Sequence, residues 1–413
     1  MLSKNRIFSY IFLLSLFPGQ IISCNILKSA DELACLFVLL LAGLDIYVNG
    51  RETIRRLLPL WITFGIMGFY VLYSVLFRSF NTPLYVVIDM VSQIKPFIPY
   101  LVVFCLGLQL TEWAKQVGRW LCLVNIFFMA VFYVWGRGQL ILPFAHISFM
   151  GSITFISSLV YLYCSLDADN RLSQRDMITV VCMLTFGLLC GRSKYFGEYI
   201  LTMVMLFFYR PRMLSKISFR MVLGVVALLC LIVVVAWTKI EYYFIQGTAE
   251  VIANGSLEDL DDSFARPVLY FTGGQILLDY FPFGSGLASF ASFASASNYS
   301  TLYYEYGLDK VWGLSPAYSE FVCDAYYPTL CQFGIVGVAV FVYFWRWIIR
   351  RMNQLDLLHR ERFRNSFVVC FGLLTFIFIE SIGSTFFIQA TGAQAMMLLG
   401  LICTPHSKNE ISQ

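Results

Sequence analysis

The chain places two basic side chains, Arg192 and Lys194, in a short stretch between two apolar runs. A guanidinium is costly in hydrocarbon, so this arginine needs water or a partner within reach. Its planar fork of donors suits bidentate binding of a carboxylate or a phosphate, and Ser193 adds a hydroxyl beside it. The stretch is therefore a candidate site for binding such a group.

Two further stretches combine charged, aromatic and glycine residues at close spacing. Residues 266–290 begin with Arg266 and read RPVLYFTGGQILLDYFPFGSGLASF. Residues 313–337 contain Glu320 and Asp324 and read GLSPAYSEFVCDAYYPTLCQFGIVG. The residue types that could perform chemistry thus gather in three places.

The elements that must position these residues are membrane helices. Hydrophobic residues make up 59% of the 413 residues, charged residues 13%, and the mean hydropathy is +0.73. Soluble domains are about a quarter charged. The sequence predicts an all-α polytopic integral membrane protein, because it has many apolar runs long enough to cross a bilayer. The twelve predicted spans are 7–23, 31–48, 57–77, 84–109, 117–135, 144–164, 176–191, 195–209, 220–238, 329–348, 365–384 and 386–403. A kink is expected in the fourth, at Lys95-Pro96.

The distribution of basic residues predicts the orientation of these spans. With the N-terminus inside, the inner segments hold 20 of the 29 lysines and arginines, and the outer segments hold 8. Cytoplasmic loops are enriched in basic residues, so both termini are expected to be cytoplasmic. Arg192 then lies at the outer rim, between the seventh and eighth spans.

One long outer loop, residues 239–328, separates the first nine spans (1–238) from the last three (329–403) and the cytoplasmic tail (404–413). We expect short helices in it. Eleven acidic and three basic residues give the loop a net charge of about −8. Nucleic acid is an unsuitable partner for such a surface, whereas Trp312 and the many tyrosines suit stacking on sugars.

Metal and cofactor sites are not indicated by the sequence. Most of the twelve cysteines lie within predicted spans, and the three histidines are scattered. No nucleotide-binding fingerprint is present. We therefore expect no metal and no cofactor.

Taken together, the three stretches resemble the O-antigen polymerase and O-antigen ligase superfamily. That family has an arginine in a short turn between two spans, here Gly191-Arg192-Ser193. A long outer loop follows, with an arginine ahead of a P-x-x-G-x-G element. Here these are Arg266 and residues 282–286, which read PFGSG and are one residue shorter than that element. A G-x-x-G element opens the next span, here residues 334–337. The resemblance covers roughly residues 180 to 340.

The resemblance implies a metal-independent membrane glycosyltransferase in the bacterial inner membrane. Its substrate would be an oligosaccharide on a polyprenyl pyrophosphate, which it would join into O-antigen, capsule or exopolysaccharide on the outer face. Membrane lipid and, as a candidate, a chain-length regulator would be its other partners. Arg192, Arg266 and Lys194 would hold the pyrophosphate, and Gly284 and Gly286 would shape the loop.

The acceptor hydroxyl of such a reaction needs a general base. Ligases of the superfamily have a histidine shortly before the G-x-x-G element, but this loop has none. The nearest ionisable candidates are Asp324 and Glu320. The departure favours a polymerase over the alternative, a ligase that passes finished chains to lipid A core.

Simpler roles stay open for each of these residues. Arg192, Arg266 and Lys194 can reach lipid phosphates as anchors, and Gly284 and Gly286 can be turn residues only. Glu320 and Asp324 can cap a helix or contact water, and Glu380 in the eleventh span is either functional or paired. A flippase for lipid-linked oligosaccharides is the alternative from another class, although transporters keep their working charges near the midplane.

Overall fold

A computed structural model describes most of the chain. It covers residues 3–16, 30–136, 147–167, 169–210, 265–359 and 363–404, with Trp237 and Glu241 as single residues. Regular structure in these ranges is helical, and they contain no β-strand. Within them, three helices are long and apolar enough to cross a membrane: Leu58–Phe77, Glu112–Trp135 and Tyr327–Gln354. A bent pair of helices raises this number to four if the pair forms one span. The protein is therefore all-helical in its described parts and has helices suited to a membrane.

Helices occupy the ranges of the predicted spans wherever those ranges are described. These helices are α1 (Lys4–Leu16), α3 (Ala30–Asn49), α5 (Leu58–Phe77), α6 (Pro83–Ile94), α7 (Phe97–Leu106), α8 (Glu112–Trp135), α9 (Ile147–Cys164), α10 (Gln174–Gly187), α11 (Ser193–Phe208), α17 (Gly334–His359), α18 (Arg364–Glu380) and α19 (Ala390–Cys403). The predicted ninth span lies outside the described residues except for Trp237. So do residues 17–23 of the first span, the loop up to residue 264 except Glu241, and the tail after Thr404.

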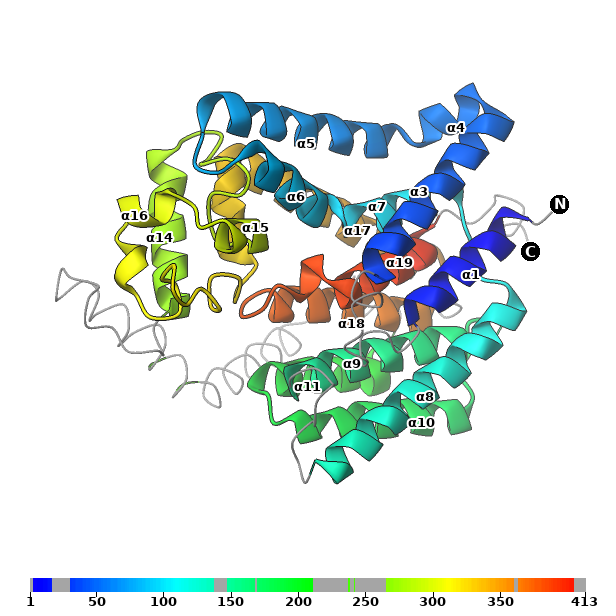
Figure 1. The fold of residues 1–413 in the computed structure, drawn as a ribbon. Coiled ribbons are helices and arrows are strands. Elements are labelled where there is room, and N and C mark those ends of the chain that lie inside the picture. Colours follow the sequence, from blue (N-terminus) through cyan, green and yellow to red (C-terminus); the bar gives the residue numbers. More distant parts are fainter. Residues whose placement is uncertain are drawn as a thin grey trace.

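The centre of the helical bundle is formed by α9, α18, α19 and α7 (Figure 1). Residues 391–403 of α19 are all buried, as expected for a helix that is apolar on every side. Glycines let these helices approach closely. A Cβ on Gly400 would lie 2.9 Å from the carbonyl oxygen of Tyr100 on α7, and one on Gly372 of α18 would lie 3.0 Å from Leu159 on α9.

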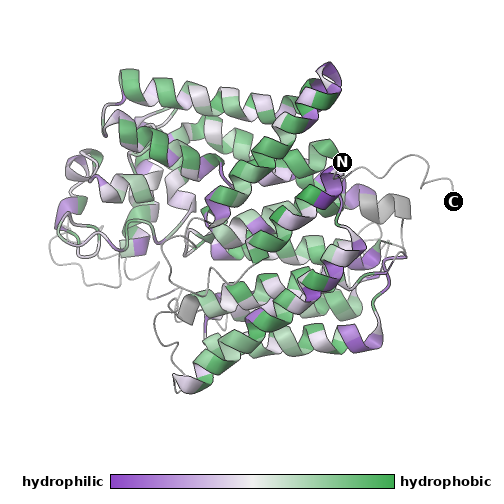
Figure 2. Cartoon of the chain, turned by 45° about the vertical axis from the view of Figure 1, so that its right-hand side comes forward, coloured by the Kyte–Doolittle hydropathy of each residue, from purple (hydrophilic) through white to green (hydrophobic). Residues whose placement is uncertain are grey.

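The outer helices expose large apolar side chains. Only 17% of the most apolar part of α5 and 22% of that of α8 is buried. Leu76 on α5 is 67% exposed, and Trp120 on α8 is 70% exposed. Apolar colour runs along these helices, and polar residues gather toward their ends (Figure 2). An apolar surface of this extent suits contact with lipid better than contact with water.

The predicted kink at Lys95-Pro96 is confirmed. The axes of α6 and α7 differ by 47° across this break, where proline has no N–H to continue the helical hydrogen bonds. The Nζ of Lys95 lies 2.5 Å from a carboxylate oxygen of Asp31 and 2.8 Å from one of Glu32. Both acids belong to the first turn of α3, so the break is tied to a neighbouring helix.

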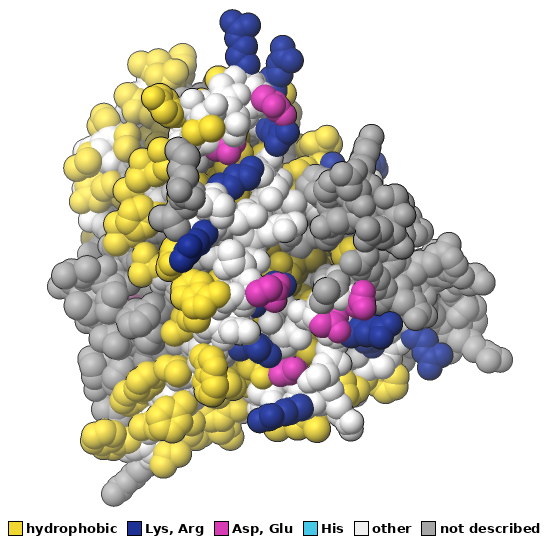
Figure 3. All heavy atoms as spheres, turned by 90° about the vertical axis from the view of Figure 1, so that its right-hand side faces the viewer, with side chains coloured by type: hydrophobic (Ala, Val, Ile, Leu, Met, Phe, Trp, Pro, Cys, Tyr) yellow, Lys and Arg dark blue, Asp and Glu magenta, His cyan; other side chains and the backbone are white. Residues whose placement is uncertain are grey.

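The beginning of α1 and the end of α19 lie at the same end of the bundle. Lys4 Nζ donates to the carbonyl oxygen of Leu106 at 3.0 Å. The next residue, Gly107, is so close to the end of α19 that a Cβ on it would lie 3.8 Å from Thr404. Lysine and arginine side chains, with fewer acidic ones, spread over this end (Figure 3). The short helix α4 (Arg51–Arg56) contributes three of these arginines.

Residues 265–333 fold at the opposite end of the bundle (Figure 1). They form α14 (Ala265–Asp279), α15 (Phe293–Ser297) and α16 (Leu302–Glu305), with 3-10 turns at Leu308–Lys310 and Tyr327–Phe333. This segment has a buried core of its own, which includes Leu269, Phe290, Tyr303, Leu314 and Val322.

Hydrogen bonds attach this segment to α5 and α6. The Ser74 hydroxyl of α5 accepts the N–H of Leu287 at 2.7 Å, and Asp89 of α6 accepts the N–H of Ala288 at 2.7 Å. Asn81, between the two helices, donates to the carbonyl oxygens of Ala288 and Asn298. Because buried polar groups need partners, these contacts specify how the segment sits on the bundle.

Candidate functional site

Arg192 lies in a tight turn between α10 and α11. After α10 ends at Gly187, residues 188–190 form a 3-10 turn, and Gly191 has a φ of 66°. Glycine suits that φ because other residues are strained there. Arg192 follows with extended backbone as the residue before α11, so its side chain leaves from the end of the hairpin.

Tyr195 packs underneath this turn. Its hydroxyl donates to the carbonyl oxygen of Leu184 at 2.7 Å, and the residue is 1% exposed. A Cβ on Gly187 would lie 2.0 Å from the tyrosine oxygen. The ring therefore fills space that only glycine leaves free, and the turn cannot easily change its shape.

Lys194 forms a partly buried ion pair with Glu380 of α18. Its Nζ lies 2.6 Å from a carboxylate oxygen of Glu380 and donates to the carbonyl oxygen of Gly383 at 2.9 Å. The hydroxyls of Ser152 and Ser384 donate to the same carboxylate at 3.1 and 2.9 Å. Glu380, whose role the sequence left open, is thus paired and hydrogen-bonded.

Arg266 approaches the same place from α14. Its Nε forms an ion pair with Asp324, and the two side chains are 38% and 26% exposed. A Cβ on Gly383 would lie 3.8 Å from the guanidinium carbon of Arg266 and 3.8 Å from Lys194 Nζ. The two cations therefore both lie next to Gly383, although they are far apart in the sequence.

Arg192 belongs to the same group of charges. Burial lowers the pKa of its guanidinium, the Glu380 carboxylate opposes this change, Arg266 adds to it, and Asp324 opposes it more weakly. Three cations and two carboxylates thus act on one another here. We call these five residues the Arg192 cluster: Arg192, Lys194, Arg266, Asp324 and Glu380.

One acidic residue beside the cluster was missed by the sequence reasoning. Glu198 lies one helical turn after Lys194 on α11 and is 0% exposed. Neither of its carboxylate oxygens has a hydrogen-bond partner. An ionised carboxylate in such surroundings is costly, which indicates a protonated side chain. The sequence could have indicated Glu198, because an acidic residue within a predicted span is uncommon.

The two predicted general bases are in different places. Asp324 lies in the Arg192 cluster. Glu320 is on the exposed surface, where it accepts a hydrogen bond from the Tyr318 hydroxyl at 2.9 Å. The structure therefore brings Asp324, and not Glu320, to the predicted pyrophosphate-binding residues.

Gly284 and Gly286 lie in a turn that packs against the start of α17, where residues 282–286 touch the G-x-x-G element of residues 334–337. Their φ values are 82° and 87°. A Cβ on Gly284 would lie 2.3 Å from the nitrogen of Gly334, and one on Gly334 would lie 2.3 Å from the nitrogen of Gly284. Any side chain at either position would force the two backbones apart.

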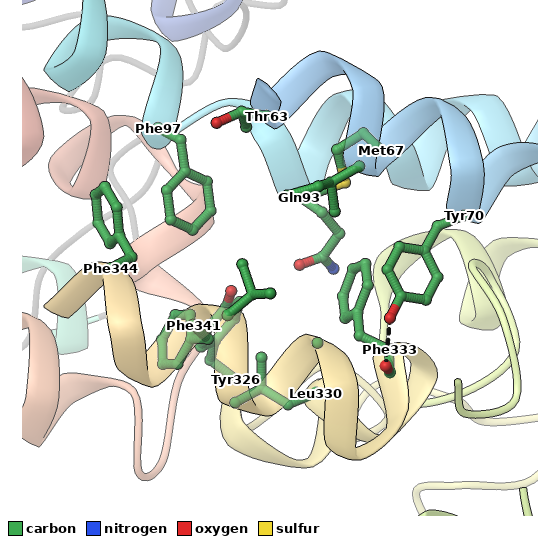
Figure 4. Close-up of a pocket in the computed structure, with 13 residues that line it drawn as sticks. Thr63, Met67, Tyr70, Gln93, Phe97, Tyr326, Leu330, Phe333, Phe341 and Phe344 are labelled. Carbon is green, nitrogen blue, oxygen red and sulfur yellow. Dashed lines mark hydrogen bonds between the residues drawn. The ribbon is translucent and has the colours of Figure 1, made fainter. Parts of the chain in front are cut away.

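An apolar pocket lies between α5, α17 and the break between α6 and α7 (Figure 4). Met67, Phe97, Phe341 and Phe344 are among its lining residues. Tyr326 forms one wall, and its N–H donates to the carbonyl oxygen of Ser381 at 3.1 Å. Since Ser381 follows Glu380 directly, this wall is joined to the polypeptide that carries the Arg192 cluster.

The Arg192 cluster can bind an anion and exchange a proton. Its arginines offer charged, directional donors, and its carboxylates are acceptors. In the described ranges, no group of three histidine, cysteine or acidic side chains is placed to hold a metal ion. No family model matches the chain, and no curated protein matches it.

Proposed function

We propose that this protein is a polymerase that joins oligosaccharide repeats carried on polyprenyl pyrophosphate. The observation that carries the proposal is the meeting of Lys194 and Arg266 at Gly383, with Arg192 in electrostatic interaction with Glu380 and Arg266. Two of these residues come from the α10–α11 turn and one from α14, so an anion between them would be held from two sides. The resemblance of their motifs to the O-antigen polymerase and ligase superfamily agrees with this role.

The proposed setting is the bacterial inner membrane, with twelve spans, residues 239–328 outside and both termini inside. The common location of Lys4 and Thr404 supports it. So does the position of residues 265–333 at the other end of the bundle (Figure 1). Reporter fusions at Ser295 and Leu355 should report opposite compartments, and the same compartment for both would refute the topology.

The ion pair between Arg266 and Asp324 suggests how the cluster works. A pyrophosphate bound to Arg192 and Arg266 would compete with Asp324 for the guanidinium, because a phosphate can take both arms of the fork. Asp324 would then be released as a carboxylate beside the substrate. Binding of the donor would thereby produce the general base only when a leaving group is present.

The reaction then follows as a displacement at the anomeric carbon of the growing chain. A hydroxyl oxygen of the incoming repeat bonds to that carbon, while the bond from the carbon to the pyrophosphate oxygen breaks. The electron pair leaves with the pyrophosphate, whose charge the arginines stabilise. The hydroxyl proton passes to Asp324.

A ligase and a flippase remain the competing functions. A ligase would use the same donor and the same arginines, and the absence of a histidine from residues 239–334 speaks against it. Deletion of the gene separates the two enzymes. Loss of a polymerase leaves single repeats on the final acceptor, whereas loss of a ligase leaves long chains on the carrier.

The flippase is favoured by one observation, the partly buried Lys194–Glu380 pair beside Glu198, since intramembrane acids often carry protons in transporters. The decisive experiment uses purified protein in liposomes, with lipid-linked repeats only on the side of residues 265–333. Chain growth without translocation supports the polymerase. Translocation without chain growth refutes it.

A further inference from the structure

Three aromatic side chains pack together in a turn that precedes Asp324 in the sequence. The proposed role of the Arg192 cluster gives them no function. The ring of Trp312 lies 4.8 Å from that of Tyr318 and 5.4 Å from that of Phe321, measured between centroids. The N–H of Phe321 donates to the carbonyl oxygen of Gly313 at 3.0 Å, which closes the turn. Gly313 has a φ of 80°, and a Cβ there would lie 2.2 Å from the Phe321 ring.

Trp312 is held at the surface by its buried neighbours. Val311 and Leu314 are 1% and 0% exposed, and both belong to the core of residues 265–333. Trp312 itself is 42% exposed. Because the residues on both sides of the tryptophan are anchored, the exposed ring has a defined position, which lowers the entropy lost when a ligand stacks on it.

A carboxylate stands next to this ring system. The Tyr318 hydroxyl donates to Glu320 at 2.9 Å and so orients a side chain that is otherwise exposed. An aromatic ring beside an oriented carboxylate matches a pyranose. The apolar face of the sugar can pack on the ring, and its hydroxyls can donate to the carboxylate oxygens.

The turn also connects this surface to the Arg192 cluster. The N–H of Asp324 donates to the carbonyl oxygen of Phe321 at 3.1 Å. Asp324, which pairs with Arg266, is therefore hydrogen-bonded through its backbone to the residue whose ring contacts Trp312. A sugar on Trp312 would be held by the same short turn that positions the proposed base.

We infer that Trp312, Tyr318 and Glu320 form a subsite that binds a pyranose of the incoming repeat. Glu320 is then a sugar-binding residue and not the general base. The role as acceptor subsite rests on the proposed polymerase function, whereas binding of the sugar does not depend on it. The competing role for Trp312 is contact with lipid headgroups at the membrane interface.

The test uses the full-length protein in nanodiscs and a lipid-free repeat oligosaccharide released by mild acid from the polysaccharide of the producing strain. Trp312→Ala should weaken binding of this oligosaccharide about tenfold, and Trp312→Tyr should restore most of it. Glu320→Gln should weaken binding less. Phe293→Ala is the matched control, since Phe293 is a 63% exposed aromatic residue of the same segment outside the turn, and it should bind as wild type.

Kinetics with the same oligosaccharide as acceptor connect the subsite to the reaction. Trp312→Ala should raise the acceptor KM about tenfold, with kcat changed less than twofold. Chain growth with an unchanged acceptor KM and unchanged oligosaccharide binding overturns the subsite and leaves the polymerase standing. If the oligosaccharide binds in a manner that depends on Trp312, but neither the wild type nor any variant extends a chain, the polymerase function is refuted and the sugar site is retained. If brominated lipid quenches the fluorescence of Trp312 and the oligosaccharide does not change this fluorescence, Trp312 contacts the membrane and the inference is refuted.

Discussion

Lys95 and Lys194 both lie against carboxylates, but the surroundings of the two lysines differ. Lys95 pairs with Asp31 and Glu32 at the break between α6 and α7, and the side chains of Lys95 and Asp31 are 9% and 6% exposed. Lys194 pairs with Glu380 and is 22% exposed. Arg266, which is 38% exposed, stands beside Lys194.

The charge balance differs as well. The Lys95 group has one cation and two carboxylates, whereas the Arg192 cluster has three cations and two carboxylates. The Lys95 group has excess negative charge, so it can stabilise a bent helix but has nothing to offer an anion. The Arg192 cluster has surplus positive charge and partial access to solvent. A pair of a lysine with a carboxylate is therefore not a functional site by itself, and the variants below separate the two cases.

The largest effect on activity is expected for Arg192→Lys and Arg266→Lys. A lysine retains the charge but cannot reproduce the bidentate fork, so elongation per folded protein should fall about a hundredfold to a thousandfold. Arg78→Lys is the matched control, because Arg78 stacks on Tyr280 at the same end of the bundle, outside the cluster. It should change the rate less than threefold. If an Arg192→Ala protein inserts normally and still makes full-length polysaccharide, the proposed role of the Arg192 cluster is refuted.

The elongation rates of the Asp324→Asn and Glu320→Gln proteins should differ by about two orders of magnitude. Removing a general base costs about a hundredfold or more, while Glu320 lies away from the cluster. Both proteins should reach wild-type levels in the membrane, because the pair of Asp324 with Arg266 is partly exposed and adds little stability. Steady-state rates at saturating acceptor measure the difference. If the Asp324→Asn protein is active, another residue must be the general base.

Lys194→Ala should reduce activity about tenfold and also lower the yield of folded protein. The variant leaves Glu380 as a buried carboxylate without its cation, which is destabilising. Adding Glu380→Gln should restore the yield but not the activity. Thermal unfolding in detergent and elongation rate per folded protein distinguish the two effects. Recovery of both by the double variant would show that Lys194 only neutralises Glu380.

The smallest effect on activity is expected for Lys95→Met. This change leaves Asp31 unpaired in the interior and should destabilise the protein by about 3–5 kcal/mol. The elongation rate of the protein that does fold should stay within twofold of wild type. Glu32→Gln is the milder companion, since Glu32 is half exposed. A specific loss of activity in Lys95→Met at normal stability would make the Lys95 group a second functional site.

Much of the helical framework follows from the sequence. Runs of apolar residues predict where α3, α5 and α8 lie, because length and hydropathy are local properties. The proline at position 96 predicts the break for a local reason too. The turn that presents Arg192 was also predicted, from the two basic residues between apolar runs.

The pairing within the site could not be predicted in the same way. Glu380 meets Lys194, and Lys194 and Arg266 both come to Gly383, only after α11, α14 and α18 have packed. Hydropathy does not say which faces of these helices meet. Asp324 and Glu320 were equal candidates in the sequence because they are four residues apart. The turn around Gly313 places Asp324 against Arg266 and leaves Glu320 at the surface.

The shortness of α19 has an electrical consequence. Its fourteen residues extend about 21 Å, against about 30 Å for the hydrocarbon core of a bilayer. In the proposed orientation, the polypeptide between α18 and α19, with Gly383 and the neighbouring charges, then lies roughly a third of the way into the membrane field. A pyrophosphate that carries about two negative charges outward from this depth gains about 1.5 kcal/mol per 100 mV of inside-negative potential. That energy corresponds to about tenfold in rate, so the membrane potential itself would help to expel the leaving group.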